Sequence, residues 1–140
     1  MERNKTILLV EDSEKDSELI RMSLGELDSS VTVERVCDGV EALEYMNLNK
    51  YPGKNIVLVL LDIKLPRMNG MEVLTKLKSD ETTRTIPVVM LTSSREERDL
   101  KDCYRLGANA YVVKPVDFKE LFEALRFTKE FWCRVNEIPL

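Results

Sequence analysis

Four apolar runs of this sequence are each followed directly by a residue with an oxygen-bearing or basic side chain. Two acidic residues, Glu11 and Asp12, follow the first run, and Asp62 ends the run IVLVLL. Thr92 follows the run IPVVML, and Lys114 follows AYVV. A carboxylate at the tip of a buried strand costs desolvation free energy. We therefore expect Asp62 to have a partner or a chemical task.

The chemistry that these residue types could support is phosphoryl transfer. Three carboxylates in one pocket repel each other strongly, and one lysine offsets only part of that charge. A hard divalent cation would remove the rest, and a donor set made only of oxygens indicates Mg²⁺ rather than zinc. A carboxylate nucleophile surrounded by a metal ion, an ammonium and a hydroxyl is typical of phosphoryl transfer. The chain contains no histidine, which excludes Ser-His-Asp and Cys-His mechanisms.

For these residues to meet, the runs before them must be parallel strands of one sheet. Three runs are apolar throughout, as central strands covered on both faces should be, whereas the run VTVERV alternates and predicts an edge strand. The carboxyl ends of parallel strands share one edge, where such sheets bind ligands. Strands are predicted at 6–10, 31–36, 56–61, 86–91 and 110–113.

Amphipathic segments alternate with the strands, which predicts an α/β fold with helices on both faces of the sheet. Ser13 with Asp16, and Asp117 with Glu120, resemble capping boxes at two helix starts. The segment 95–106 is mostly charged and predicts a loosely held helix. Helices are predicted at 14–27, with Leu27 on its apolar stripe, and at 40–48, 70–79, 95–106 and 118–135.

Composition limits the remaining possibilities. The chain has 140 residues, 44% apolar and 33% charged, which fits one soluble domain. Its formal net charge of -4 argues against binding nucleic acid through phosphate neutralisation. No apolar run approaches the roughly 20 residues needed to cross a membrane, so we expect a cytoplasmic protein without membrane contact. Three scattered cysteines without a CxxC pattern predict reduced thiols.

In combination, these motifs resemble the receiver domain of two-component response regulators, over roughly residues 5 to 128. The motifs are LLVEDS, LLDIKLPRMNG, PVVMLTSS and GANAYVVKP, in that order. The resemblance implies a flavodoxin-like, doubly wound sheet of five parallel strands in the order 2-1-3-4-5, with five flanking helices. Residues 1–140 would form a single receiver domain, with the last helix and tail at 129–140 extending beyond its core.

The resemblance also implies a metal-dependent phosphoacceptor site. Asp62 would receive a phosphoryl group from the phosphohistidine of a sensor histidine kinase. Asp12 would bind Mg²⁺ directly and Glu11 would assist, while Asp62 and the main-chain carbonyl of Lys64 complete the metal site. The protein would then be a signalling protein that catalyses only its own phosphoryl transfer and dephosphorylation. Glu11 stands where aspartate is commoner in the family, and Lys64 is a cation at a position that influences dephosphorylation.

Other residues would contact the phosphoryl group or respond to it. Thr92 would hydrogen-bond the group, Lys114 would pair with it, and the peptide bond from Lys114 to Pro115 would be cis. Tyr111 matches an aromatic switch position, so movement of Thr92 would carry residues 92–106 and Tyr111 with it. The output surface would be the face formed by residues 95–106, the fifth strand and the last helix.

Simpler interpretations exist for each residue taken alone. Glu11 and Asp12 could serve only as helix caps, Lys114 as a surface charge and Thr92 as a helix start. Packing alone would equally explain Tyr111. A receiver-like scaffold that is never phosphorylated is the alternative function. A phosphatase of the haloacid-dehalogenase type is disfavoured because it needs a second acid where Lys64 stands, and no GxGxxG follows the first strand.

The end of the chain, FTKEFWCRVNEIPL, resembles stand-alone regulators that partner bacterial phytochrome kinases. We expect no effector domain, so the protein would act through protein contacts or pass its phosphoryl group onward. Phe127, Phe131 and Trp132 lie on a last helix that is longer than the fold requires. Trp132 can pack on the sheet, whereas Phe127 and Phe131 would either fold back on the domain or, with Trp132, form a homodimer interface.

Overall fold

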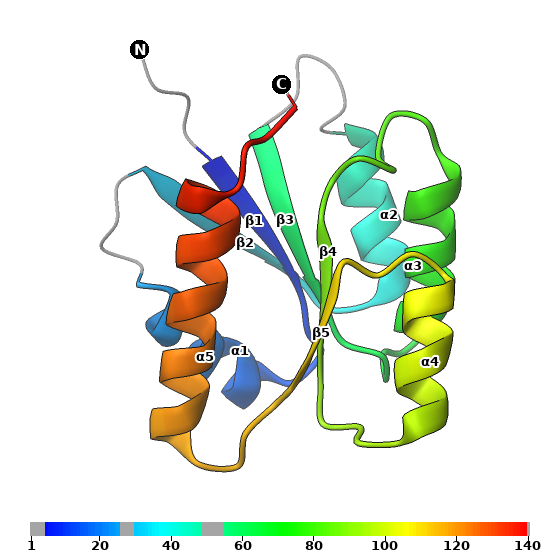
Figure 1. Ribbon diagram of the computed structural model, residues 1–140. Helices are drawn as coiled ribbons and strands as arrows, with labels where there is room; N and C mark the ends of the chain where they lie inside the picture. Colours follow the sequence, from blue (N-terminus) through cyan, green and yellow to red (C-terminus); the bar gives the residue numbers. More distant parts are fainter. Residues whose placement is uncertain (1–4, 26–29, 49–54, 140) are drawn as a thin grey trace.

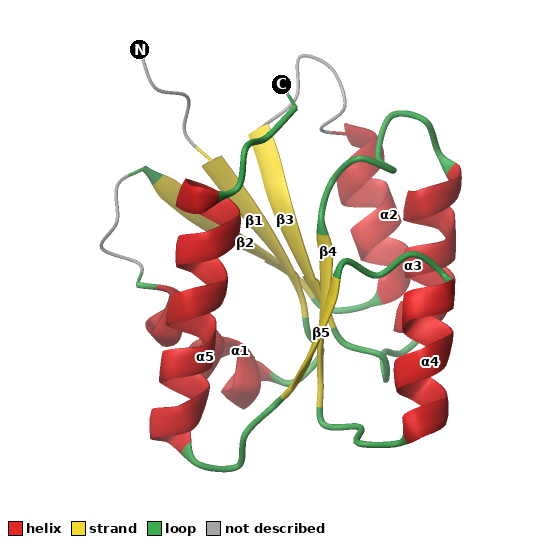
Figure 2. Cartoon of the chain, viewed as in Figure 1, coloured by secondary structure: helices red, strands yellow, loops and turns green. Residues whose placement is uncertain are grey.

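The computed structural model, which describes residues 5–25, 30–48 and 55–139, has one sheet of five parallel strands (Figures 1 and 2). The strand order is β2-β1-β3-β4-β5, which confirms the predicted order and places β2 at an edge. The strands are β1 Lys5–Val10, β2 Val31–Val36, β3 Asn55–Leu61, β4 Val88–Thr92 and β5 Ala110–Val113.

Helices cover both faces of this sheet. In Figure 1, α1 and α5 lie on one face, whereas α2, α3 and α4 lie on the other. No helix in the described ranges is both long enough and apolar enough to span a bilayer. The helices are α1 Glu14–Leu24, α2 Gly39–Leu48, α3 Gly70–Ser79, α4 Glu97–Arg105 and α5 Phe118–Glu130, which continues as a π-helical turn over Phe131–Val135.

The alternation of side chains along the central strands divides the core into two layers. Leu8 and Val10 pack with the helices α2 and α3, while Ile7 and Leu9 pack with α1 and α5. All four of these side chains are at most 1% exposed, as expected for a parallel sheet covered on both faces. In α4, by contrast, Cys103 is the one buried residue.

Element boundaries differ from the sequence prediction where backbone geometry intervenes. Helix α1 ends at Leu24 because Gly25 adopts a left-handed conformation with φ 74° and donates its N–H to the Met22 carbonyl. The predicted continuation to Leu27 lies outside the described residues. Strand β4 begins after Pro87, which has no N–H to donate to a ladder, rather than at residue 86.

Two further helix ends also depart from expectation. Helix α4 begins at Glu97 rather than residue 95, because Glu96 keeps an extended backbone as its N-cap. The last helix is not α-helical through residue 135. Its final turn widens, and the N–H of Asn136 reaches back five residues to the Phe131 carbonyl at 2.7 Å.

The two predicted capping boxes are only half formed. Ser13 Oγ accepts the N–H of Asp16 at 3.1 Å, but the Ser13 N–H donates to Glu11 Oε2 instead of the Asp16 carboxylate. Asp117 caps α5 by accepting the N–H of Lys119 at 2.8 Å rather than that of Glu120. The Asp16 carboxylate is therefore available for a contact elsewhere.

Candidate functional site

The sheet brings the predicted site residues to one edge. Asp62 N donates to the Val10 carbonyl at 3.3 Å, which ties the end of β3 to the end of β1, where Glu11 follows. Lys114 N donates to the Thr92 carbonyl at 2.7 Å, which ties the ends of β5 and β4 in the same way. Residues far apart in sequence therefore meet because parallel ladders align the carboxyl ends of their strands.

Three of these side chains form an acidic cluster. One carboxylate oxygen each from Glu11, Asp12 and Asp62 lies within 4.8 Å of the others. Glu11 is 2% exposed and Asp62 9%, whereas Asp12 is open to solvent. Burial raises the pKa of the Glu11 carboxyl, although Lys114 and the Ser13 N–H act against that shift. A crowded, partly buried set of hard oxygens fits Mg²⁺, whose charge would offset the repulsion.

Lys114 is the cation at the centre of the cluster. Its Nζ donates to Glu11 Oε1 at 2.5 Å and to Asp62 Oδ2 at 2.9 Å. Burial alone would lower the pKa of Lys114, but the hydrogen bond to Glu11 and the charge of Asp62 outweigh it and raise that pKa. The ammonium therefore stays protonated and binds the first and third strands together at the site.

Asp16 is a site residue that sequence reasoning used only as a helix cap. Its Oδ2 lies 3.2 Å from Lys114 Nζ, so the three N–H donors of the ammonium have three carboxylate partners. The available signal was its position, because Asp16 lies in the first turn of the helix that follows the acidic pair. A side-chain contact between α1 and the end of β5 has no signature in the sequence itself.

Arg35 is a second residue that the sequence analysis missed. Its Nε donates to the Glu11 carbonyl at 3.0 Å, and its second terminal nitrogen donates to the Asp12 carbonyl at 3.3 Å. This edge-strand side chain thus fixes the backbone of the acidic pair from β2. Its position next to the end of β1 follows from the register, in which Arg35 pairs with Leu9.

A chain of hydrogen bonds joins Thr92 to Tyr111. Thr92, which is buried, accepts the Ser94 N–H on its Oγ1 at 3.3 Å. Ser94 Oγ donates to Asp99 on α4 at 2.6 Å, and Tyr111 Oη donates to the Ser94 carbonyl at 3.0 Å. Tyr111 therefore bonds to the loop between β4 and α4 in addition to packing on the core. Ser94 and Asp99 were not singled out from the sequence.

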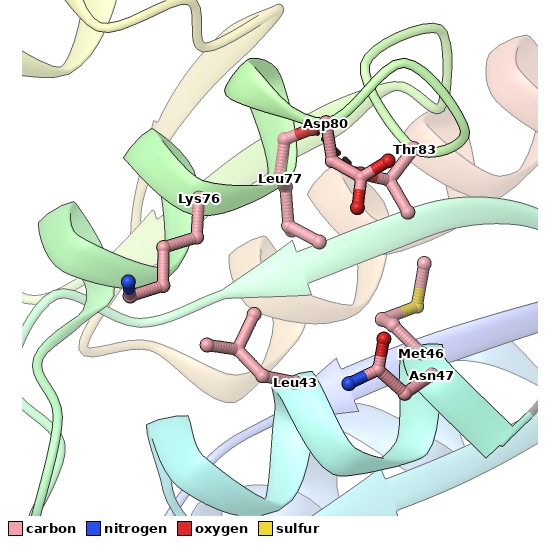
Figure 3. A pocket seen from close by; sticks show the side chains of 7 residues that line it. All are labelled: Leu43, Met46, Asn47, Lys76, Leu77, Asp80 and Thr83. Atoms are coloured by element: carbon pink, nitrogen blue, oxygen red, sulfur yellow. Dashed lines mark hydrogen bonds between the residues drawn. The ribbon is translucent and has the colours of Figure 1, made fainter.

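An open cleft of about 580 Å³ lies beside Asp62. Its walls include Lys64, Thr92 and Asp99, so the space borders the residues that carry the chemistry. A smaller hollow of about 180 Å³ lies between α2 and α3, where Leu43 and Met46 face Leu77 (Figure 3). None of the predicted site residues lines that hollow. The cleft at Asp62 is therefore the candidate site.

Comparisons with known proteins agree on one family. The profile of the response regulator receiver domain matches residues 7–126. The probable methanogenesis regulatory protein FilR2 of Methanothrix harundinacea is 38% identical over 95% of this chain and 86% of its own length. Response regulator Rcp1 of Synechocystis is 35% identical over 96% of this chain and 93% of its own length.

Solved structures of similar proteins cover nearly the whole chain. The phosphorylated cyanobacterial phytochrome response regulator RcpA has a TM-score of 0.90 and 36% identity, over 98% of this chain and 99% of that one. The Mn²⁺-bound form of Rcp1 has a TM-score of 0.88 and 33% identity, over 97% of this chain and 99% of that one.

We predict that Lys114→Met destabilises the metal-free protein by about 3 kcal/mol at neutral pH, because Glu11 and Asp62 lose their shared cation. The loss should shrink on acidification. The pKa of the Glu11 carboxyl is raised above its ordinary value of 4.5, so Glu11 takes up a proton at a higher pH than a free carboxyl does. Once Glu11 is neutral it no longer needs the cation, and the variant regains stability as the pH falls. Urea unfolding at several pH values measures both effects. Lys101→Met, which removes an exposed pair with Glu97, is the matched control and should change little.

An equal free energy of unfolding for Lys114→Met and the wild type at neutral pH would contradict the described electrostatics. So would a loss that stays constant down to the acid limit of folding.

Proposed function

This chain belongs to the response regulator receiver domain family, and we propose that Asp62 is its phosphoacceptor. Phosphorylation and Mg²⁺ binding are typical of this family. The observation that carries the assignment to Asp62 is the contact of its carboxylate with Lys114 at 2.9 Å, inside the acidic cluster and beside an open cleft. A donor phosphohistidine could approach Asp62 through that cleft.

The proposed reaction is an in-line displacement at phosphorus. An oxygen of the ionised Asp62 carboxylate attacks, the phosphorus–nitrogen bond of the donor phosphohistidine breaks, and the electron pair leaves with the imidazole. The product is an acyl phosphate on Asp62. Hydrolysis of that acyl phosphate by water would return the carboxylate and inorganic phosphate. Self-catalysed transfer and hydrolysis are thus the whole of the proposed chemistry.

We propose that Glu11, Asp12, Asp62 and the main-chain carbonyl of Lys64 hold Mg²⁺. The bound ion would supply positive charge against the carboxylates and the phosphoryl oxygens. The Mn²⁺-bound form of the relative Rcp1 supports a divalent cation here. Lys64 has an exposed side chain and lines the cleft, where its charge would influence the lifetime of the acyl phosphate.

Lys114 and Thr92 would contact the phosphoryl oxygens. Because Glu11, Asp62 and Asp16 occupy the three donors of Lys114, the ammonium must exchange one carboxylate for a phosphoryl oxygen. Thr92 would turn its hydroxyl toward the same group. A cis peptide bond before Pro115 stays a prediction from the family resemblance.

We predict that acetyl phosphate with Mg²⁺ adds the mass of one phosphoryl group to this protein, and that Asp62→Asn abolishes the gain. Intact-protein mass spectrometry measures it, with Glu97→Gln as a matched surface control that should be labelled like the wild type. Chelation of the metal should also prevent labelling. No labelling of the wild type would instead favour the alternative of an unphosphorylated receiver-like scaffold.

A sensor histidine kinase is the partner class of receiver domains, and we propose a phytochrome kinase for this member. The similarity to RcpA, over 99% of that chain, supports this choice and supports the receiver domain over 1–140 as the working unit. The reaction would occur in the cytoplasm, where phosphoryl donors derived from ATP are available. Transfer from a phosphorylated phytochrome kinase that outpaces transfer from an unrelated histidine kinase would support the assignment, and equal rates would argue against it.

The proposed response to phosphorylation runs through Ser94. Thr92 cannot reorient its hydroxyl without disturbing its contact with the Ser94 N–H, and Ser94 also contacts Asp99 and Tyr111. A change at Thr92 would therefore reach α4 and the aromatic switch position together. The output face would be α4, β5 and α5.

We predict that phosphorylation changes amide hydrogen exchange within residues 92–106 about tenfold, the size of a typical coupling free energy near 1.4 kcal/mol. Mass spectrometry with and without acetyl phosphate measures the change. Asp62→Asn under the same conditions should show none. Equal exchange in the phosphorylated and free wild-type protein would sink this proposal.

We also propose a homodimer through the last helix. Phe127 is 64% exposed and Phe131 47%, so neither side chain folds back into the core of the domain. Trp132 packs against the core layer between the sheet and the helices α1 and α5. Its ring meets that of Phe131 edge-on, with 4.9 Å between the ring centroids, and so holds Phe131 in place. Exposed aromatic side chains of this size favour a contact with another surface.

We predict that Phe127→Ser and Phe131→Ser each raise the dimer dissociation constant at least about tenfold, because each removes a large apolar contact. Sedimentation analysis over a range of concentrations measures it. Phe122→Ser, on the same helix but outside this pair, is the control. A wild type that stays monomeric at high concentration would exclude the dimer.

A further inference from the structure

The loop that follows Asp62 contains a strained turn. The Met68 N–H donates to the Pro66 carbonyl at 2.7 Å, two residues back, which makes a γ-turn centred on Arg67. Arg67 has φ 64° and is the one non-glycine residue with positive φ among the described residues. A long side chain rarely adopts this conformation, and it persists only where its surroundings enforce it.

An ion pair with Asp38 stabilises Arg67 in this strained conformation. Arg67 Nε donates to Asp38 Oδ2 at 2.9 Å, while Asp38 Oδ1 accepts the Glu41 N–H at 2.8 Å. The Glu41 N–H lowers the pKa of Asp38, and the Arg67 guanidinium adds to it against the effect of burial. Asp38 is thus a fixed anion at the start of α2, and it holds Arg67 from the neighbouring loop.

Close backbone contacts at two glycines restrict the path of the loop that contains this turn. A Cβ on Gly39 would lie 2.1 Å from the Met68 carbonyl oxygen, so the backbone of the loop rests directly on the start of α2. A Cβ on Gly70 would lie 2.0 Å from the Asp62 carbonyl oxygen, and the Gly70 N–H donates to Ile63 at 2.8 Å. The stretch between these two glycine contacts carries Asp62 and Lys64.

We propose that Arg67 is a positioning residue for the metal site, and that its ion pair with Asp38 fixes the path of the loop that carries the Lys64 carbonyl, the proposed ligand. The proposal rests on the proposed function, because it takes that carbonyl as a ligand. The Arg67 side chain is 56% exposed, so the pair adds little to global stability. Its effect is geometric, like that of other groups that orient metal ligands from behind.

Arg67→Gly separates positioning from stability. Glycine adopts positive φ without strain, so the melting temperature of the metal-free variant should equal or exceed that of the wild type. Its Mg²⁺ dissociation constant, measured by calorimetry, should nevertheless rise about tenfold. Amide exchange at residues 63–69 should be faster in the metal-free variant than in the wild type.

Three further variants complete the experiment. Asp38→Asn keeps a good N-cap for α2 but removes the anion, and should weaken Mg²⁺ binding as Arg67→Gly does. Arg67→Lys keeps the charge and should restore part of the affinity. Arg105→Ala breaks an exposed pair with Asp102 at 2.6 Å far from the loop, and should change neither affinity nor loop exchange.

Wild-type affinity for Mg²⁺ in Arg67→Gly would overturn the positioning role, even if the protein is phosphorylated normally. A wild type that binds no Mg²⁺ would overturn the proposed metal site itself. In that case loop exchange still decides the structural part, because equal exchange in Arg67→Gly and the wild type would show that the ion pair does not hold the loop.

Discussion

The concentration of negative charge at one edge of an apolar sheet is the constraint on which the site depends. Glu11 and Asp62 are buried where strands end, and Asp12 and Asp16 add two more carboxylates at the rim. One ammonium, from Lys114, stands against all four. The cluster is tolerable only while compensating charge is present, and this makes it receptive to a small hard cation.

The fold produces this crowding through backbone alignment rather than through local sequence. Strands β1 and β3 pair in parallel and so deliver Glu11 and Asp62 to one edge, while the pairing of β4 with β5 delivers Lys114 beside Thr92. Contacts of the loops with neighbouring backbone then fix the fine geometry. The Arg35 side chain binds the main-chain carbonyls of Glu11 and Asp12 in the loop after β1. In the loop after β3, Arg67 binds Asp38.

Much of this arrangement could be predicted from the sequence because it follows from periodicity. Uninterrupted apolar runs identified the central strands, and parallel alignment then predicted which residues meet. Individual side-chain hydrogen bonds could not be predicted in the same way, as those of Asp16, Arg35 and Ser94 show. The end of α1 had a signal in Gly25, because glycine is typical of helix C-caps, whereas the widened last turn has no such pattern in the sequence. Helical spacing likewise left open whether Phe127 and Phe131 face solvent.

The shallow anchoring of α4 bears on how proteins of this fold diversify. With Cys103 as its one buried residue, α4 can change charge and shape at its exposed positions at little cost to folding. Its exposed surface already carries one acidic and three basic side chains, those of Glu97, Arg98, Lys101 and Arg105. After gene duplication, two copies of such a protein could therefore come to bind different partners through substitutions on this one helix. Two signalling pathways in the same cell would then stay separate while the core is unchanged.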